Sequence, residues 1–224
     1  MPSVIADPKL RALLERLHAD SDAQKAATSE YFRRRGEAGE LSWEGLDSDA
    51  HRFMADKLVA LDPIKAEFCY LLCRALSARR VVEVGTSFGV STLYLAQAVK
   101  ENGGGVVIGT EHEPEKAKAA RVNFWEAGLD KFIDLREGDL RETLKSIEGP
   151  IDFVLMDIWT EMTRPAIELI APHLRQGAVV CADNTAAVRE PYRHFFDFVY
   201  DPGNGMITQT LPFDGGFEMT VKVR

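Results

Sequence analysis

The pattern of apolar and polar residues divides the chain into two parts. In the first part, Leu10, Leu13 and Leu17 recur at the spacing of a helix among many charged residues. From residue 58 onward, short runs of mainly β-branched residues alternate with stretches of helical spacing. We therefore expect an N-terminal helical extension over residues 1–57 and one folded domain over residues 58–224.

The extension is expected to be helical, with a second helical stretch that starts near Asp49 and is broken at Leu61-Asp62-Pro63. Helices are predicted over residues 7–36, followed by a loop over 36–49 that is rich in Gly, Ser, Asp and Glu. Trp43 in that loop is expected to anchor it to the domain or to a partner subunit. Asp62-Pro63 is a strong start signal for a further helix over 64–76. The loop before this helix is expected to lie close to the ligand pocket.

Five short apolar runs predict the strands of the domain. They cover residues 81–84, 106–111, 132–136, 151–156 and 178–182. Helices are expected between and after them, among others over 114–125, 165–174 and 190–200. The alternation predicts a Rossmann-like, doubly wound α/β fold with a mostly parallel sheet. Two further alternating runs, 206–212 and 217–223, are joined by a glycine-containing turn and predict a C-terminal antiparallel hairpin.

A glycine loop follows the first predicted strand. Residues 85–89 read Gly-Thr-Ser-Phe-Gly and lead into a helix, so free backbone N–H groups and the positive helix end face a ligand. A dinucleotide-binding loop has glycine where this chain has Ser87 and Val90. The loop therefore suits a carboxylate better than a pyrophosphate. Glu83 within the apolar strand would be expensive to bury unpaired, and an ammonium group on the ligand would serve as its partner.

Acidic residues recur at the ends of the predicted strands. They are Glu83, Glu111, Asp139, Asp157 and Asp183. Ligands of doubly wound sheets bind outside the carboxyl ends of the strands, so all five acids are expected to converge on one crevice. Glu111 lies about where an acid of a βαβ unit takes ribose hydroxyls. One such acid is often only the cap of the next helix, but five at one edge favour a binding site.

Composition and charge narrow the class of protein. The chain has 224 residues, of which 46% are hydrophobic and 28% charged, as expected for a globular protein. Its net charge of −8 and the lack of a basic stripe disfavour nucleic-acid binding. No apolar run approaches membrane-spanning length, which favours a soluble, cytoplasmic protein. Cys69, Cys73 and Cys181 lack metal-type spacing with histidine, and core packing is favoured for the Cys69 and Cys73 pair.

The motifs resemble those of class I O-methyltransferases that use S-adenosylmethionine, of the catechol and caffeoyl-coenzyme A type. The resemblance covers about residues 58–224. It is carried by Val82-Glu83-Val84-Gly85-Thr86 with Gly89 and Ser91, by Glu111, by Gly138-Asp139, by Leu155-Met156-Asp157-Ile158-Trp159 and by Ala182-Asp183-Asn184. It implies methyl transfer to a hydroxyl oxygen of a small, catechol-like or phenolic acceptor, and it implies a homodimer.

The resemblance also assigns the site. The residues implied to hold the methionine end of the cofactor are Glu83, Gly85, Thr86, Ser87, Gly89 and Ser91. Glu111 would take the ribose, and Asp139 with Leu140 the adenine. Asp157, Asp183 and Asn184 would bind a divalent cation, Mg²⁺ by its preference for oxygen ligands. Asp157 would thus be both a cofactor contact and a catalytic residue, because the cation would lower the pKa of the acceptor hydroxyl.

One position departs from the family pattern. The family has a lysine three residues after the first metal-binding acid, and this chain has Thr160, which cannot act as a base at neutral pH. Either the metal suffices, or Lys65 or His51 substitutes from the N-terminal side, or the acceptor is not a catechol. Trp159 either stacks on a ligand or packs in the core. The alternatives are a metal-independent N- or O-methyltransferase, a nicotinamide-dependent oxidoreductase and a non-catalytic cofactor-binding module.

Overall fold

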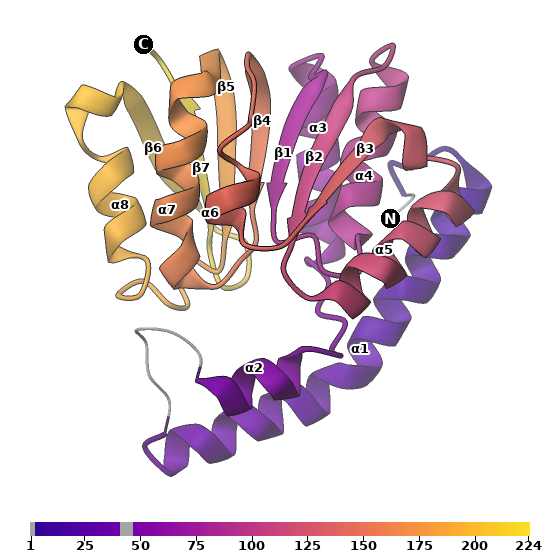
Figure 1. The fold of residues 1–224 in the computed structure, drawn as a ribbon, viewed down its shortest axis with the longest axis vertical. Coiled ribbons are helices and arrows are strands. Elements are labelled where there is room, and N and C mark those ends of the chain that lie inside the picture. Colours follow the sequence, from indigo (N-terminus) through magenta and orange to yellow (C-terminus); the bar gives the residue numbers. More distant parts are fainter. Residues whose placement is uncertain (1–2, 41–46) are drawn as a thin grey trace.

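One sheet of seven strands forms the centre of the molecule (Figure 1). The structure is a computed structural model, and it describes residues 3–40 and 47–224. The strands are β1 (Arg80–Val84), β2 (Val106–Glu111), β3 (Ile133–Glu137), β4 (Ile151–Met156), β5 (Leu174–Asp183), β6 (Met206–Leu211) and β7 (Phe217–Lys222). Their order is β3-β2-β1-β4-β5-β7-β6, with the first five parallel and β7 antiparallel to both β5 and β6. The predicted doubly wound sheet and its terminal hairpin are confirmed.

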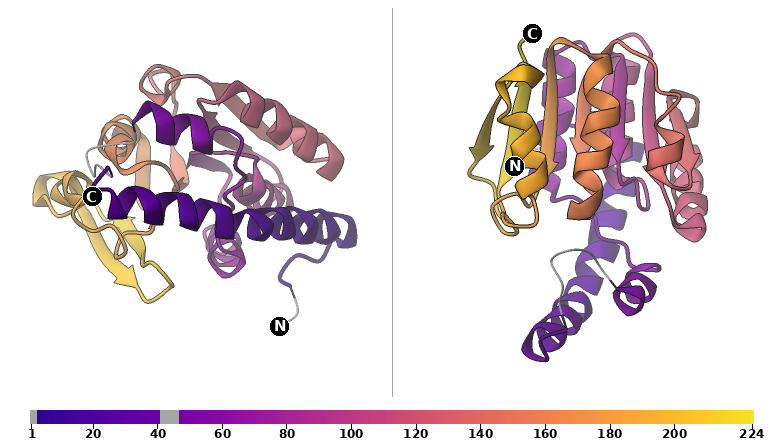
Figure 2. Two further views of the ribbon diagram at one scale, coloured as in Figure 1. Left: turned by 90° about the horizontal axis from the view of Figure 1, so that it is seen from below. Right: turned by 60° about the vertical axis from the view of Figure 1, so that its left-hand side comes forward.

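Helices cover both faces of the sheet (Figures 1 and 2). On one face lie α1 (Pro8–Glu37), α3 (Pro63–Ala75), α4 (Val90–Glu101) and α5 (Pro114–Ala127), and on the other α6 (Leu140–Thr143), α7 (Thr160–Ile170) and α8 (Arg193–Val199). Successive strand residues point to opposite faces, so Val81 and Phe153 enter the first core while Val82 and Val154 enter the second. Burial on both faces explains why the central strands are apolar almost throughout.

The long helix α1 has two differently placed halves. Leu10, Leu13 and Leu17 are buried and belong to the core of the domain. The second half projects beyond the carboxyl edge of the sheet, together with α2 (Ser48–Met54), as Figures 1 and 2 show. Tyr31 and Phe53 stack with ring centroids 3.8 Å apart and join the two helices. The extension is therefore fixed to the domain through the first half of α1, while Trp43 lies outside the described residues.

Asp62 caps α3 as the sequence predicts. Its carboxylate accepts a hydrogen bond from the backbone N–H of Ile64 at 2.9 Å, and Pro63 is the first residue of the helix. The cap fixes where α3 begins, and therefore where the preceding segment, Leu58–Leu61, enters the helix. This segment reaches the site described below.

Loss of this cap is expected to weaken the fold measurably. Asp62→Ala should lower the free energy of unfolding by about 1 kcal/mol, because an N–H of the first turn loses its acceptor. Urea denaturation at neutral pH measures the change. Asp56→Ala, at an exposed residue that pairs with Lys57, should stay within about 0.5 kcal/mol of the parent chain. Equal losses in the two variants would contradict the role of the cap.

Helix α7 begins earlier than predicted. The sequence predicts this helix over 165–174, with Pro165 at the first position, where proline is common. The helix instead spans Thr160–Ile170 and contains Pro165. Buried residues on both sides of the proline, Thr163 and Ile167, continue one helical face, and this packing outweighs the hydrogen bond that the proline cannot donate. The expected helix over 165–174 is therefore displaced toward the end of β4.

Candidate functional site

The five strand-end acids lie along the carboxyl edge of the sheet. The chain passes from β1 to β2 on one side and later to β4 on the other, so the strand order reverses between β1 and β4. Glu83, Asp157 and Asp183 are close enough for their charges to interact, and Glu111 acts on Glu83. Asp139, at the end of β3, is the outlying member. The structure thus brings four of the five acids together beside the point where ligands of such sheets bind.

The glycine loop packs directly against the peptide that follows β4. Gly85 has a φ of +95°, and a Cβ atom at this position would lie 2.1 Å from the carbonyl oxygen of Asp157. The backbone N–H of Thr86 donates to the carbonyl of Thr110 at 2.9 Å, and the N–H of Gly89 donates to Thr86 at 2.8 Å. Glycine is required at residue 85 by this close approach as well as by its backbone angle.

Glu83 lies behind the loop with no exposed surface. Its carboxylate accepts hydrogen bonds from the hydroxyls of Thr86 at 2.9 Å, Ser91 at 2.6 Å and Thr92. Burial raises the pKa of Glu83 to about 7, although the three hydroxyl donors act in the opposite direction. The carboxylate therefore holds the loop to the start of α4, and an ammonium group on a ligand has no direct path to it in this arrangement.

Glu111 and Asp139 also bind their own backbone neighbourhood. Glu111 accepts from the N–H of Ser87 at 2.6 Å and from the N–H of Glu113 at 2.8 Å, so it ties the end of β2 to the glycine loop. Asp139 caps α6, and the guanidinium of Arg141 lowers the pKa of its carboxyl to about 2. Leu140 beside it is buried. The predicted ribose and adenine contacts of these residues stay predictions.

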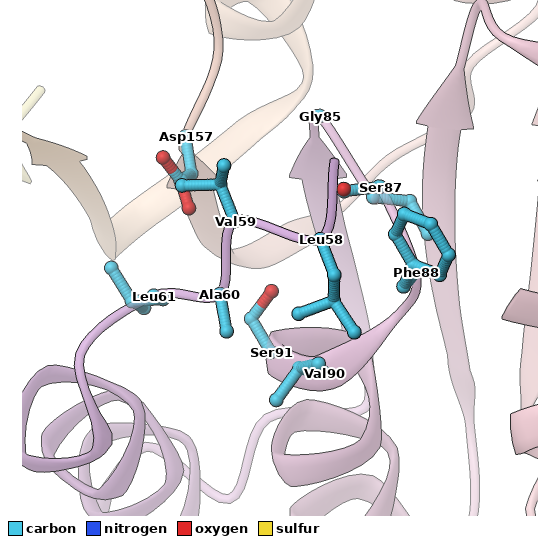
Figure 3. Close-up of a pocket in the computed structure, with 11 residues that line it drawn as sticks. Leu58, Val59, Ala60, Leu61, Gly85, Ser87, Phe88, Val90, Ser91 and Asp157 are labelled. Atoms are coloured by element: carbon cyan, nitrogen blue, oxygen red, sulfur yellow. The ribbon is translucent and has the colours of Figure 1, made fainter. Parts of the chain in front are cut away.

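A small hollow that opens to solvent lies between Leu58–Leu61 and the glycine loop (Figure 3). Of the predicted cofactor residues, its lining includes Gly85, Thr86, Ser87, Ser91 and Asp157. The expectation that the loop before α3 lies close to the pocket is confirmed. Leu58, Val59 and Phe88 also line the hollow and were not predicted as site residues. The helix start at Asp62-Pro63 pointed to the segment of Leu58 and Val59, and Phe88 lies within the predicted glycine loop.

Asp157 is the half-buried acid that faces this hollow (Figure 3). Burial and the neighbouring carboxylates of Asp183 and Glu83 raise its pKa to about 8, while the ammonium of Lys65 opposes the rise. Burial, together with the charges of Asp157 and Asp183, raises the pKa of the Tyr192 hydroxyl. Asp157 therefore lies at the centre of the electrostatic cluster, between the hollow and Asp183.

Asp183 forms a buried ion pair with Lys65, a residue of α3. The Lys65 Nζ lies 2.5 Å from the Asp183 Oδ1, and the two side chains are 5% and 9% exposed. The same Oδ1 accepts the N–H of Asn184 at 2.8 Å, and the Asn184 Nδ2 donates to Oδ2 at 3.1 Å. Both oxygens of Asp183 are thus engaged by groups of the chain itself.

This arrangement does not fit a divalent cation on Asp157, Asp183 and Asn184. A cation needs oxygen atoms that converge on one point, whereas Lys65 and the Asn184 amide nitrogen face the Asp183 carboxylate. The Asn184 Oδ1 lies beside Gly215, since a Cβ at that glycine would approach it to 2.6 Å. Within residues 3–40 and 47–224, no group of three or more His, Cys, Asp or Glu side chains is placed to hold a metal ion. Thr160 begins α7 and offers no base, and His51 is exposed on α2.

Comparison with known proteins gives consistent matches. A family model described as "Methyltransferase domain" matches residues 82–185. A catechol O-methyltransferase of Mycobacterium tuberculosis is 35% identical over 127 residues, 56% of this chain and 57% of that protein. One from Niastella koreensis is 30% identical over 134 residues, 56% of this chain and 58% of that protein. The match therefore spans less than three-fifths of either curated relative.

Solved structures match over almost the whole chain. A cofactor-bound protein from MTB has a TM-score of 0.70 at 26% identity, covering 98% of this chain and 91% of the other. An O-methyltransferase from Bacillus cereus in complex with SAH has a TM-score of 0.66 at 21% identity, which covers 93% of this chain and 99% of the other and shows the shared fold.

The sheet order and the glycine loop define a Rossmann-like fold, and over residues 82–185 the chain is similar to methyltransferase domains. Within that class, the chain is similar to the O-methyltransferases of the catechol and caffeoyl-coenzyme A type, as its motifs indicated. None of the helices in the described ranges combines the length and the apolar character that crossing a membrane requires.

Proposed function

We propose that this chain transfers a methyl group from S-adenosylmethionine to a hydroxyl oxygen of a small molecule. The observation that carries the proposal is the hollow between Leu58–Leu61 and the glycine loop, with Asp157 on its wall. The relatives named as O-methyltransferases, and a neighbour solved with the demethylated cofactor, support the same reaction. A nicotinamide cofactor is disfavoured by Ser87 and Val90, which replace the glycines that a pyrophosphate needs.

The residues around the hollow fit the methionine end of this cofactor. The N-terminus of α4 suits its carboxylate, while Asp157 suits its ammonium group. Gly85, Thr86, Ser87 and Gly89 shape the loop, and Glu83 fixes it from behind. The nucleoside would lie outside the hollow, toward Glu111, Asp139 and Leu140.

The chain positions the reactants for this reaction. When bound, S-adenosylmethionine supplies an electrophilic methyl group on a sulfonium centre. Asp157 orients the methionine end, and Leu58–Leu61 covers the glycine loop, which limits the access of water. Val59 and Trp159 are 51% and 39% exposed, and we propose that they contact an aromatic acceptor.

Four finer predictions belong to this proposal. The Mg²⁺ expected at Asp157, Asp183 and Asn184 would require Lys65 to leave Asp183, so we derive no step through a cation. A homodimer and a cytoplasmic location also stay predictions. We also keep the prediction of a domain boundary at residue 57. We propose that the extension before it lies on the side of the sheet where the acceptor binds.

Calorimetry tests the cofactor directly. We expect S-adenosylmethionine to bind and NAD⁺ not to bind, and a transfer assay should show a methylated product with phenolic acceptors. Asp157→Asn should lower kcat/KM by about a hundredfold, because the ammonium of the bound methionine end, which would favour the ionised form of Asp157, loses that partner and the reactants lose alignment. Asp134→Asn, an exposed acid on β3, should leave kcat/KM unchanged. Binding of NAD⁺ alone, or methylation of amines only, would contradict the proposal.

A further inference from the structure

We propose that the Lys65 ammonium occupies the role of the divalent cation that the family resemblance predicts. It would hold the acceptor oxygen beside Asp183, and the reaction would run without a divalent ion. The inference rests on the proposed function and deepens it, because it also names the acceptor class. That class is a phenol bound through one ionised hydroxyl, in place of a vicinal pair chelated by a metal.

The position of Lys65 follows from the start of α3. Asp62 caps this helix, and Lys65 lies one turn further, directly after the segment that covers the hollow. Its side chain reaches the end of β5, where the Nζ meets Asp183 and lies 5.9 Å from the centre of the Phe217 ring. The lysine charge is therefore delivered to the carboxyl edge of the sheet from the face that carries α3.

Lys65 retains hydrogen-bonding capacity at this place. An ammonium group has three N–H donors, and among the described residues its recorded hydrogen bond is the one to Asp183. Phe217 offers only the face of its ring. Two donors thus remain for an anionic oxygen, and the charge of Lys65 also acts on Asp157 beside the hollow.

The charge balance argues against an added cation. Lys65 already compensates Asp183 in a site where both side chains are more than nine-tenths buried. A divalent ion would have to displace the ammonium and leave it buried without a partner, which is energetically costly. A lone ammonium also lacks the ordered coordination sites that bind two neighbouring hydroxyls at once.

The methyl transfer itself is balanced without a metal. The acceptor enters as its phenolate, its proton having passed to water, and the ammonium hydrogen-bonds the negative oxygen. The oxygen forms a bond to the methyl carbon while the carbon–sulfur bond breaks, and that electron pair stays on sulfur. The products are the methyl ether and S-adenosylhomocysteine.

The first experiment compares metal dependence in the full chain. With an acidic monophenol as acceptor, activity with EDTA should equal activity with added Mg²⁺ within about twofold. Electron paramagnetic resonance should detect no stoichiometric Mn²⁺ binding. Activity that EDTA abolishes and Mg²⁺ restores, or Mn²⁺ binding that Asp183→Ala removes, would overturn the inference while leaving the proposed function intact. Failure to bind S-adenosylmethionine would instead refute the proposed function.

The second experiment removes the ammonium. Lys65→Met should lower kcat/KM by about a hundredfold or more, and Lys65→Arg should recover part of it. Because Lys65→Met leaves Asp183 unpaired, the double variant Lys65→Met/Asp183→Asn removes both charges and should fold, as circular dichroism and calorimetric binding of S-adenosylmethionine would verify. That variant should stay inactive. Its full activity would overturn the inference, and Lys100→Met at an exposed site of α4 serves as the matched control.

The acceptor class is tested with matched substrates. A monophenol and a catechol of similar acidity should show similar kcat/KM, since only one oxygen is bound. A strict requirement for the vicinal pair would contradict the inference.

Discussion

Gly85→Ala is expected to abolish detectable binding of S-adenosylmethionine and to lower the free energy of unfolding by about 3 kcal/mol. The added Cβ would lie 2.1 Å from the carbonyl oxygen of Asp157, a backbone atom that cannot turn aside. Relief would require β1 and the segment after β4 to separate, although the N–H of Asp157 bonds to Val84 at 3.0 Å. Calorimetry and urea denaturation measure the two effects.

Substitution of a second glycine, Gly104, distinguishes the effect of the steric clash from that of the backbone angle. Gly104 has a φ of +98°, close to the +95° of Gly85, and a Cβ there would meet no atom within 4 Å. Gly104→Ala should therefore show only the cost of the unfavourable angle, about 1 to 2 kcal/mol, with normal cofactor affinity. If Gly85→Ala were no worse than Gly104→Ala in either measurement, the close packing of the loop would not matter for binding.

The sequence predicted the fold well because local signals and long-range packing agree. Asp62 and Pro63 start α3, and the apolar runs of β1, β2 and β4 match strands buried on both faces. Helix α7 was the exception, since Pro165 gives a local start signal that the amphipathic pattern overrides. A proline inside a helix cannot be distinguished from one at its start without knowing which face is buried.

The sequence predicted only that the site lies at the carboxyl edge of the sheet. Parallel strands bring their carboxyl ends together, so the position of the acids follows from topology. The hydrogen-bonding partners of these acids cannot be predicted from topology. Lys65 and Asp183, for example, are 118 positions apart and meet only through the packing of α3 on the sheet. From the sequence, Lys65 was one of several possible substitutes for the lysine that Thr160 replaces. Nothing in the sequence indicated that the hydroxyls around Glu83 would bind its carboxylate, beyond their place in the glycine loop and the following helix.

The burial of Glu83 has a measurable consequence for stability. Its pKa is about 7 in the folded chain against an ordinary 4.5, so the folded chain holds the proton to higher pH than the unfolded chain does. Between pH 4.5 and about 7, Glu83 is mainly ionised in the unfolded chain and mainly protonated in the folded chain. The stability that this group contributes is therefore complete below pH 4.5, falls as pH rises to about 7 and stays constant above that.

Comparison with Glu83→Gln isolates this contribution. The amide keeps the shape of the side chain and a carbonyl acceptor for the Thr86 hydroxyl but cannot ionise. The difference between 7 and 4.5 corresponds to about 3 kcal/mol. The free energy of unfolding of the parent chain, minus that of the variant, should therefore fall by about that amount between pH 4.5 and pH 8 in urea denaturation. Asp157, whose pKa the Glu83 charge raises, is removed from the comparison by measuring both proteins in an Asp157→Asn background. The more distant carboxyl groups titrate alike in both and cancel, so parallel stability curves would show that Glu83 is ionised in the fold and that its hydroxyl partners outweigh burial.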